Sequence, residues 1–209
     1  MRVLVACEFS GIVRDAFRAR GHDAWSCDLL PCEADPKWHI QGDVLPLLND
    51  GWDLMVAHPP CTYLSGVGNR HLKVPGRLEK RKEGMEFFMQ FVKAPIPRIC
   101  VENPVGYPCS AYRKADQIIH PYMFGERVLK RTCLWLKGLS PLIWIKNDDL
   151  LDDATATEYP EPVYLLKTNG KRIHHTEALK GVSKERRGYA RSKFWPSIAN
   201  AMAEQWSNL

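Results

Sequence analysis

Two short motifs place a thiol and a carboxyl group where they could do covalent and acid chemistry. His58-Pro59-Pro60-Cys61 follows one apolar run, and Glu102-Asn103-Pro104 follows another. Two prolines fix the backbone, so they would hold the Cys61 thiol at one position, as a nucleophile requires. A Glu102 carboxyl group kept protonated by its surroundings could donate to a ring nitrogen. Each motif alone is also explained by structure, as a turn before a buried cysteine or as a capping carboxylate.

Three further features are typical of a site for a nucleotide-like ligand. The small-residue turn Glu8-Phe9-Ser10-Gly11 would let such a ligand approach the backbone and the start of the next helix. Asp28 ends a second apolar run, where a carboxylate can accept hydrogen bonds from both ribose hydroxyls. Asp43, after Ile40, could contact an adenine ring. The alternatives are a glycine that only serves the turn, and carboxylates that only cap turns.

These residues need elements that bring them together. Short apolar runs alternate with segments of helical periodicity: the runs are 3–6, 24–27, 53–57 and 98–102, and the helical segments are 11–20, 79–92 and 195–206. The alternation predicts an α/β fold with a mostly parallel sheet. Ligands of such folds bind at the carboxyl ends of the strands, which is where the residues above fall.

The composition is that of an ordinary globular protein. With 209 residues, 45% hydrophobic and 25% charged, one domain is expected. No stretch approaches the ~20 apolar residues of a membrane span, and the N-terminal run is too short for a signal peptide, so we expect a cytoplasmic protein. The odd number and scattered spacing of the seven cysteines argue against a disulfide framework. The lack of a C-x-x-C pair argues against a structural zinc site, so no metal is expected. The net charge of +5 suits a polyanionic partner without requiring one.

In this order along the chain, the motifs resemble those of the C5-cytosine DNA methyltransferases. Pro59-Pro60-Cys61 is similar to the family's Pro-Pro-Cys nucleophile motif, and Glu102-Asn103 to its Glu-Asn-Val motif. Phe9-Ser10-Gly11 resembles the first S-adenosylmethionine motif, Asp28 the acidic second and Asp43 the third. Residues 196–203 resemble the last motif, a helix that packs beside the cofactor. The resemblance covers about residues 1–139 and 191–206.

The resemblance implies a class I S-adenosylmethionine-dependent methyltransferase, with a Rossmann-like, mostly parallel sheet flanked by helices. The implied reaction moves a methyl group from S-adenosylmethionine to C5 of cytosine in DNA. Cys61 would attack C6, Glu102 would hydrogen-bond or protonate N3, and Arg131 would orient the base carbonyl or the backbone. The cofactor-binding residues implied are Phe9, Ser10, Gly11, Asp28, Leu29, Asp43, Val44, Pro59 and Asn200.

The sequence departs from the family pattern at several places. Gly11 is followed by Ile12-Val13-Arg14 in place of the usual Gly-x-Gly-Gly, and His58 replaces a small residue. Lys130-Arg131-Thr132 lies where the family has Gln-x-Arg-x-Arg. We expect a single domain, 1–209, in which a short, partly basic insertion at 140–190 replaces a target-recognition domain of about 100 residues. Recognition of a target sequence would then be weak or fall to a partner protein.

Two basic stretches could bind DNA. The first follows Cys61, in a segment that in the family is a mobile loop closing over the base, and its candidates are Arg70, Lys73 and Arg77. The second lies between 167 and 193, with aromatic residues nearby for stacking, and its candidates are Lys171, Arg172, Arg186 and Arg187. The alternative is a solvated basic face.

Three functions are compatible with the sequence. A DNA cytosine-C5 methyltransferase is the first. The same chemistry could act on a free cytosine nucleotide or on RNA, because a recognition domain is lacking. The altered glycine motif would also suit a catalytically silent nucleic-acid-binding relative, although retention of both Cys61 and Glu102 argues against it. Amino-methyltransferases are disfavoured. Their corresponding motif is similar to Asp/Asn-Pro-Pro-Tyr, whereas this chain has His58 and Cys61 at the first and last of these positions.

Overall fold

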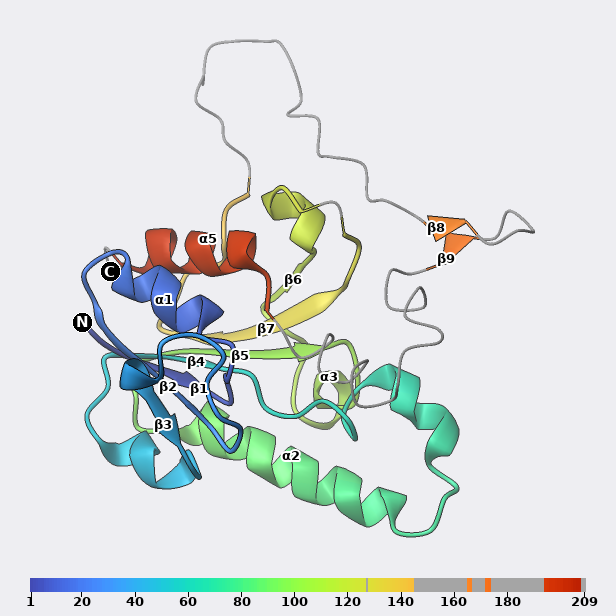
Figure 1. Cartoon of the computed structure of the whole chain (residues 1–209). Helices are drawn as coiled ribbons and strands as arrows, with labels where there is room; N and C mark the ends of the chain where they lie inside the picture. The colour runs from blue at the N-terminus through green and yellow to red at the C-terminus, as the bar shows by residue number, and fades with distance from the viewer. Residues whose placement is uncertain (127, 145–164, 167–171, 174–193, 208–209) are drawn as a thin grey trace.

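The computed structural model describes residues 1–126, 128–144, 165–166, 172–173 and 194–207 (Figure 1). Its centre is a seven-stranded sheet in the order β3-β2-β1-β4-β5-β7-β6. The strands are β1 Arg2–Ala6, β2 Asp23–Asp28, β3 His39–Gln41, β4 Leu54–Ala57, β5 Arg98–Pro104, β6 Gln117–Ile119 and β7 Thr132–Lys137. Neighbours among β1 to β5 pair in parallel, whereas β7 is antiparallel to both β5 and β6. This order, with one reversed strand beside β5, is the Rossmann-like class I methyltransferase fold, as expected.

Helices cover both faces of the sheet. The α-helices are α1 Ile12–Arg18, α2 Arg77–Lys93, α3 Pro108–Ala111 and α5 Pro196–Trp206, and the 3-10 helices are η1 Pro36–Trp38, η2 Leu45–Asn49, η3 Gly66–His71 and η4 Pro121–Phe124. α1 and α5 lie together on one face, and α2 runs across the other (Figure 1). The expected insertion, 140–190, lies mostly outside the described residues, apart from 140–144 and the antiparallel pair β8 (Leu165–Leu166) and β9 (Arg172–Ile173).

The central strands are apolar on both sides because both faces of the sheet are covered. Every residue from Val3 to Ala6 and from Leu54 to Ala57 is buried. Such strands read as continuous apolar runs, not as alternating ones. The register places Ala6 beside Ala57, and Ala57 beside Val101. The carboxyl ends of β1 and β4 are therefore level, and β5 continues beyond them to Pro104.

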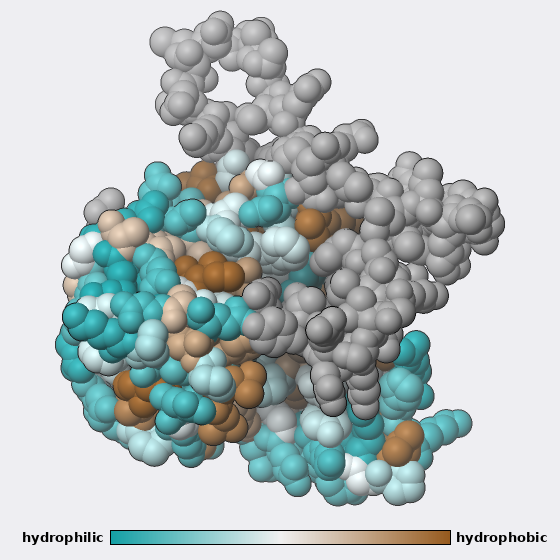
Figure 2. Space-filling view, viewed as in Figure 1, coloured by the Kyte–Doolittle hydropathy of each residue, from teal (hydrophilic) through white to brown (hydrophobic). Residues whose placement is uncertain are grey.

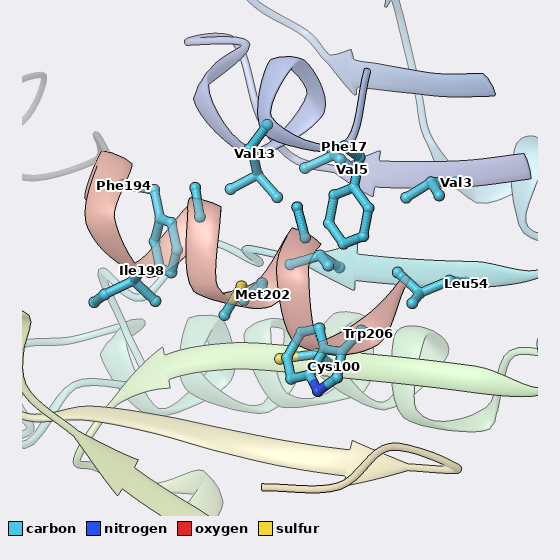
Figure 3. Close-up of a cluster of buried hydrophobic side chains, with 14 of the residues drawn as sticks. Val3, Val5, Val13, Phe17, Leu54, Cys100, Phe194, Ile198, Met202 and Trp206 are labelled. Atoms are coloured by element: carbon cyan, nitrogen blue, oxygen red, sulfur yellow. The ribbon is translucent and has the colours of Figure 1, made fainter. Parts of the chain in front are cut away.

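The α1/α5 face carries the larger of the two buried clusters. Residues at helical spacing on α5, including Ile198, Met202 and Trp206, pack against Phe17 of α1 and Cys100 of β5 (Figure 3). Trp206 is 1% exposed, and its indole Nε1 donates to the carbonyl of Ser140 at 3.0 Å. The C-terminal helix is thus an integral part of the core.

The opposite face is packed by aromatic side chains of α2. Phe88 and Phe91 are fully buried, and Phe88 meets Trp135 of β7 edge to face, with ring centroids 5.1 Å apart. Such aromatic pairs stabilise beyond the area they bury. β7, which the sequence did not predict as a strand, therefore ties the edge of the sheet to α2.

Figure 2 shows apolar groups scattered among polar ones on one side of the molecule. Among the helices of the described residues, none has the length and apolar character needed to cross a bilayer.

Truncating Trp206 tests the importance of α5. We expect Trp206→Ala to lower the free energy of unfolding by about 3–5 kcal/mol, because it leaves a large cavity in the α1/α5 core. Ile143→Ala is the matched control: Ile143 is 69% exposed, and its change should stay within about 0.5 kcal/mol. Urea unfolding monitored by circular dichroism measures both. Equal effects would mean that α5 is not part of the core.

Candidate active site

The residues singled out in the sequence gather along one edge of the sheet. β3, β2, β1, β4 and β5 are neighbours and point the same way, so their carboxyl ends form a row. Asp28 ends β2, His58 follows β4 directly, and Glu102 lies near the end of β5. The crossover at β1 and β4 is where α/β folds bind ligands.

One buried hydrogen bond joins the two chemical motifs. The Asn103 side-chain amide Nδ2 donates to the carbonyl of Pro59 at 2.7 Å, and Asn103 is 1% exposed. Pro59 is buried, whereas Cys61, two residues on, is exposed. The Pro-Pro segment thus leads from a fixed point inside the protein to a thiol at the surface of the site.

The backbone after Cys61 turns at once. The carbonyl of Cys61 accepts hydrogen bonds from the amides of Leu64 (3.1 Å) and Ser65 (2.9 Å). The chain then pairs with the segment that follows β5: the amide of Gly66 donates to Val105, and that of Tyr107 donates to Leu64. We call these two paired segments, 61–66 and 105–107, the paired loops.

Gly106 permits the paired loops to touch. A Cβ atom there would lie 2.1 Å from the carbonyl oxygen of Leu64 and 2.8 Å from the amide nitrogen of Gly66. Both atoms belong to the backbone, so neither has a side-chain rotation by which to yield. No side chain is compatible with this approach, which couples the position of Cys61 to that of Glu102.

Two arginines of α2 donate hydrogen bonds to the segment that follows Cys61. Arg81 is 8% exposed and donates to the carbonyl of Tyr63 and to the side chain of Asn69. Arg77 donates to the carbonyl of Thr62 at 3.2 Å, and its guanidinium lies over the Tyr63 ring. Arg77, expected at DNA phosphates, therefore supports the backbone next to Cys61 in this structure.

Glu102 lies beside a histidine. His58 Nδ1 is 3.3 Å from Glu102 Oε2, and the two side chains are only 10% and 12% exposed. The ring of His58 packs on Phe194, with centroids 4.7 Å apart. The other ring nitrogen, Nε2, is buried with no hydrogen-bond partner among the described residues. In the sequence, His58 was noted only as a departure from the family pattern.

A buried carboxyl group, that of Glu8, lies in the turn between β1 and α1. Glu8 is 3% exposed and accepts hydrogen bonds from the amides of Val13 and Arg14 and from the hydroxyl of Ser10. Burial raises the pKa of Glu8, partly offset by nearby His58 and by these amides. Cys7 has a φ of 59°, a left-handed conformation unusual for a residue other than glycine. This kink ends β1 and turns Glu8 toward α1.

Arg14, on the first turns of α1, lies close to Gly11. Its guanidinium is fully buried and donates to Asp15, to the hydroxyl of Ser26 and to the sulfur of Cys32. A Cβ atom on Gly11 would come within 2.7 Å of Arg14 Nη2. The Arg14 side chain thus connects α1, β2 and the loop that follows β2.

The two aspartates expected at the cofactor lie on neighbouring strand ends. Both Asp28 and Asp43 raise the pKa of the Cys27 thiol, to about 11, although burial is the larger cause. One oxygen of each is taken by a local backbone amide, that of Leu30 for Asp28 and that of Leu45 for Asp43. Beside them, Leu29 is 73% exposed, while Val44 is buried.

Other predicted residues lie farther from this centre. Arg131 is exposed just before β7 and lowers the pKa of His120, after burial as the main cause. Asn200 is on the exposed side of α5, and Arg70 and Lys73 are exposed in and after η3. Arg172 lies in β9, whereas Lys171, Arg186 and Arg187 lie outside the described residues. Within the described part of the chain, no three His, Cys, Asp or Glu side chains gather as a metal site.

Among known proteins, similarity is found with solved structures. Neither a scan against protein-family models nor a search of curated proteins found a match. A solved structure described as a DNA modification methyltransferase encoded within an E. coli prophage is similar at 16% identity and a TM-score of 0.41. The match covers 88% of this chain and 56% of that one, so this chain spans little more than half its length. The strand order and register alone carry the fold assignment.

The cysteines should differ sharply in reactivity. Burial raises the pKa of Cys7 and Cys100 well above that of a free thiol, and that of Cys133 to about 12. A raised pKa leaves less thiolate at neutral pH, and the thiolate is the reactive form. We expect a brief pulse of iodoacetamide to label exposed Cys61 first, as read by peptide mass mapping. The unfolded chain, in which all seven cysteines should react, is the control. Labelling of Cys100 as fast as Cys61 in the folded protein would contradict this arrangement.

Gly106→Ala tests the paired loops. We expect it to cost about 1–3 kcal/mol of stability, because the added methyl group overlaps the backbone of Leu64. It should also change the rate at which iodoacetamide labels Cys61. Gly84→Ala in α2 is the control: its Cβ would meet Leu64 at an ordinary 3.6 Å, and the better helix former should add about 0.5–1 kcal/mol. Unchanged stability and labelling in Gly106→Ala would refute the close approach.

Proposed function

We propose that this chain is an S-adenosylmethionine-dependent methyltransferase that modifies C5 of cytosine in DNA through a covalent adduct on Cys61. The observation that carries the proposal is the hydrogen bond from Asn103 to the carbonyl of Pro59, 2.7 Å long and buried. It joins the Pro-Pro-Cys segment to the Glu-Asn segment, so a thiol and a carboxyl group are held at adjacent strand ends. This pair matches the two demands of the reaction.

The chemistry explains why a thiol and an acid are both needed. C5 of cytosine is a poor nucleophile. Addition of the Cys61 thiolate to C6 moves electron density to C5, and a proton from Glu102 to N3 stabilises that charge. After C5 has gained the methyl group, loss of its proton restores the double bond and expels Cys61. No described residue hydrogen-bonds Glu102 Oε1, so this oxygen is available to the base.

The strand ends of β1, β2 and β3 fit S-adenosylmethionine. Asp28 has Oδ2 left for ribose hydroxyls and Asp43 has Oδ2 left for an adenine amino group, because the Oδ1 atoms accept the local amides. Leu29, with 73% of its surface exposed, offers an apolar face for the adenine ring. When bound, S-adenosylmethionine supplies the methyl group as an electrophile. Phe9, Ser10, Gly11, Val44, Pro59 and Asn200 complete the proposed cofactor site.

Access by DNA is supported by exposed cations near the thiol. Arg70 and Lys73 follow Cys61 at the surface and can reach phosphates. A cytosine in duplex DNA must leave the base stack to meet Cys61, and exposed apolar side chains in this region, Val67 and Val74, could fill the space left behind. Arg131 is proposed to orient the base.

Transfer of labelled methyl from S-adenosylmethionine tests the proposal. Duplex DNA, single-stranded DNA, RNA and free cytosine nucleotides are compared, and the product is identified as 5-methylcytosine. We expect label in DNA, abolished in Cys61→Ala with the fold intact. Label found only in nucleotides or RNA would show that DNA is not the substrate, while the proposed reaction at C5 would stand. No transfer, together with no cofactor binding by calorimetry, would favour a catalytically silent relative.

Two further variants separate the proposed roles. Glu102→Gln should lower kcat by about 10²–10⁴-fold, because a general acid is lost, while calorimetry shows little change in cofactor binding. Asp28→Ala should do the reverse, weakening S-adenosylmethionine binding with a smaller effect on the rate at saturation. If Glu102→Gln instead impaired binding alone, its role as the acid would be wrong.

A further inference from the structure

The carboxyl ends of β1, β4 and β5 bring two acids to the two sides of one histidine. His58 follows Ala57 of β4, and Glu102 follows Val101 of β5, and those two preceding residues are register partners. His58 and Glu102 therefore project from the same face of the sheet, and their side chains meet at 3.3 Å. His58 also lies near enough to the buried carboxyl group of Glu8 to influence the pKa of that group.

The imidazole is enclosed on every side that the structure describes. Glu8 after β1 and Glu102 on β5 are the titratable groups that face it, and Phe194, before α5, contributes an uncharged ring. Its own side chain is 10% exposed. A polar ring placed in such a position would be replaced by an apolar one if packing were its only purpose, because burying an unsatisfied polar atom costs free energy.

The hydrogen-bond inventory indicates where the ring carries its proton. Nδ1 has one partner, Glu102 Oε2, and buried Nε2 has none among the described residues. A proton on Nε2 would be a buried N–H without an acceptor, which proteins avoid more strictly than an unused acceptor. The neutral tautomer with its proton on Nδ1 satisfies both nitrogens best, and Nδ1–H then donates to Glu102 Oε2.

We propose that His58 is a positioning residue for Glu102, an inference that rests on the proposed function. Its Nδ1–H holds Oε2, which leaves Oε1 as the oxygen that gives its proton to N3 of the cytosine. When that proton leaves, Glu102 becomes a carboxylate, and the hydrogen bond from His58 strengthens because its acceptor is now charged. The interaction is thus stronger after proton transfer than before it, which lowers the barrier.

A matched pair of substitutions separates this role from packing. The amide Nδ2 of asparagine can take the place of Nδ1–H, whereas leucine fills the space without a donor. We expect His58→Leu to lower kcat by about 10- to 100-fold, since misplacement of a reacting group by about 1 Å has this effect, with little change in KM for DNA or S-adenosylmethionine. His58→Asn should restore most of the lost rate. Similar losses in both variants, or none in His58→Leu, would overturn the proposal.

The pH dependence of kcat gives a readout that packing would not move. Without the donor, the Glu102 carboxylate is less stable, so Glu102 should keep its proton to higher pH. In His58→Leu, the pH at which kcat falls on the alkaline side should therefore be higher, and the maximum kcat should be lower. The pH profile of His58→Asn should match that of the unmodified enzyme. A profile of unchanged shape in His58→Leu would assign His58 to packing alone.

A measurement without substrate keeps this inference separate from the proposed function. In protein labelled with ¹⁵N-histidine, we expect the NMR spectrum of His58 to show the Nδ1–H tautomer with slow proton exchange. The protection should persist in Cys61→Ala and be lost in Glu102→Leu. The opposite tautomer would overturn the positioning role. If this NMR signature is present and no nucleic acid or nucleotide is methylated, the proposed function fails while the His58–Glu102 pair stands.

Discussion

The active-site edge depends on a hydrogen bond that two prolines make necessary. Pro59 and Pro60 have no amide hydrogen, so this segment cannot continue the ladder of β4 into its neighbour. The side chain of Asn103 supplies the missing connection by donating to the Pro59 carbonyl from β5. This contact holds the segment that leads to Cys61, and the paired loops and the arginines of α2 support the backbone beyond it.

The two halves of the site are built by different means. Around Cys61, the backbones of the paired loops are in direct contact, which Gly106 permits. Arg77 and Arg81 of α2 also donate hydrogen bonds to backbone carbonyl groups of this region. Around the turn between β1 and α1, side chains connect the neighbouring elements, above all buried Arg14, which donates hydrogen bonds to Ser26 and Cys32. The first arrangement tolerates almost no change in one glycine, because the backbones of the paired loops leave no room for a Cβ atom. The second depends on the length and charge of one arginine side chain.

Sequence patterns predicted the elements that have a continuous apolar run or a helical periodicity and that end at turn residues. The apolar runs around Val3 and Leu54 predicted central strands because both faces of these strands are buried. β3, β6 and β7 were missed. The edge strands β3 and β6 are three residues long and carry no pattern, and the run from Cys133 to Leu136 can be read as either helix or strand. His58 was noticed only as a departure from the family motif. Its contact with Glu102 spans 44 residues of sequence and depends on the strand register, which local patterns do not contain.

Glu8 has a consequence for which cofactors this fold can accept. In dinucleotide-binding folds, the amides at the start of the first helix receive a pyrophosphate. Here the buried carboxyl group of Glu8 already accepts the amides of Val13 and Arg14 at that point. A phosphate would have to displace an acid that belongs to the protein, and two anions would then compete for the same donors. In this structure the amides at the first turn of α1 are therefore already hydrogen-bonded within the protein and are not open to a phosphate group.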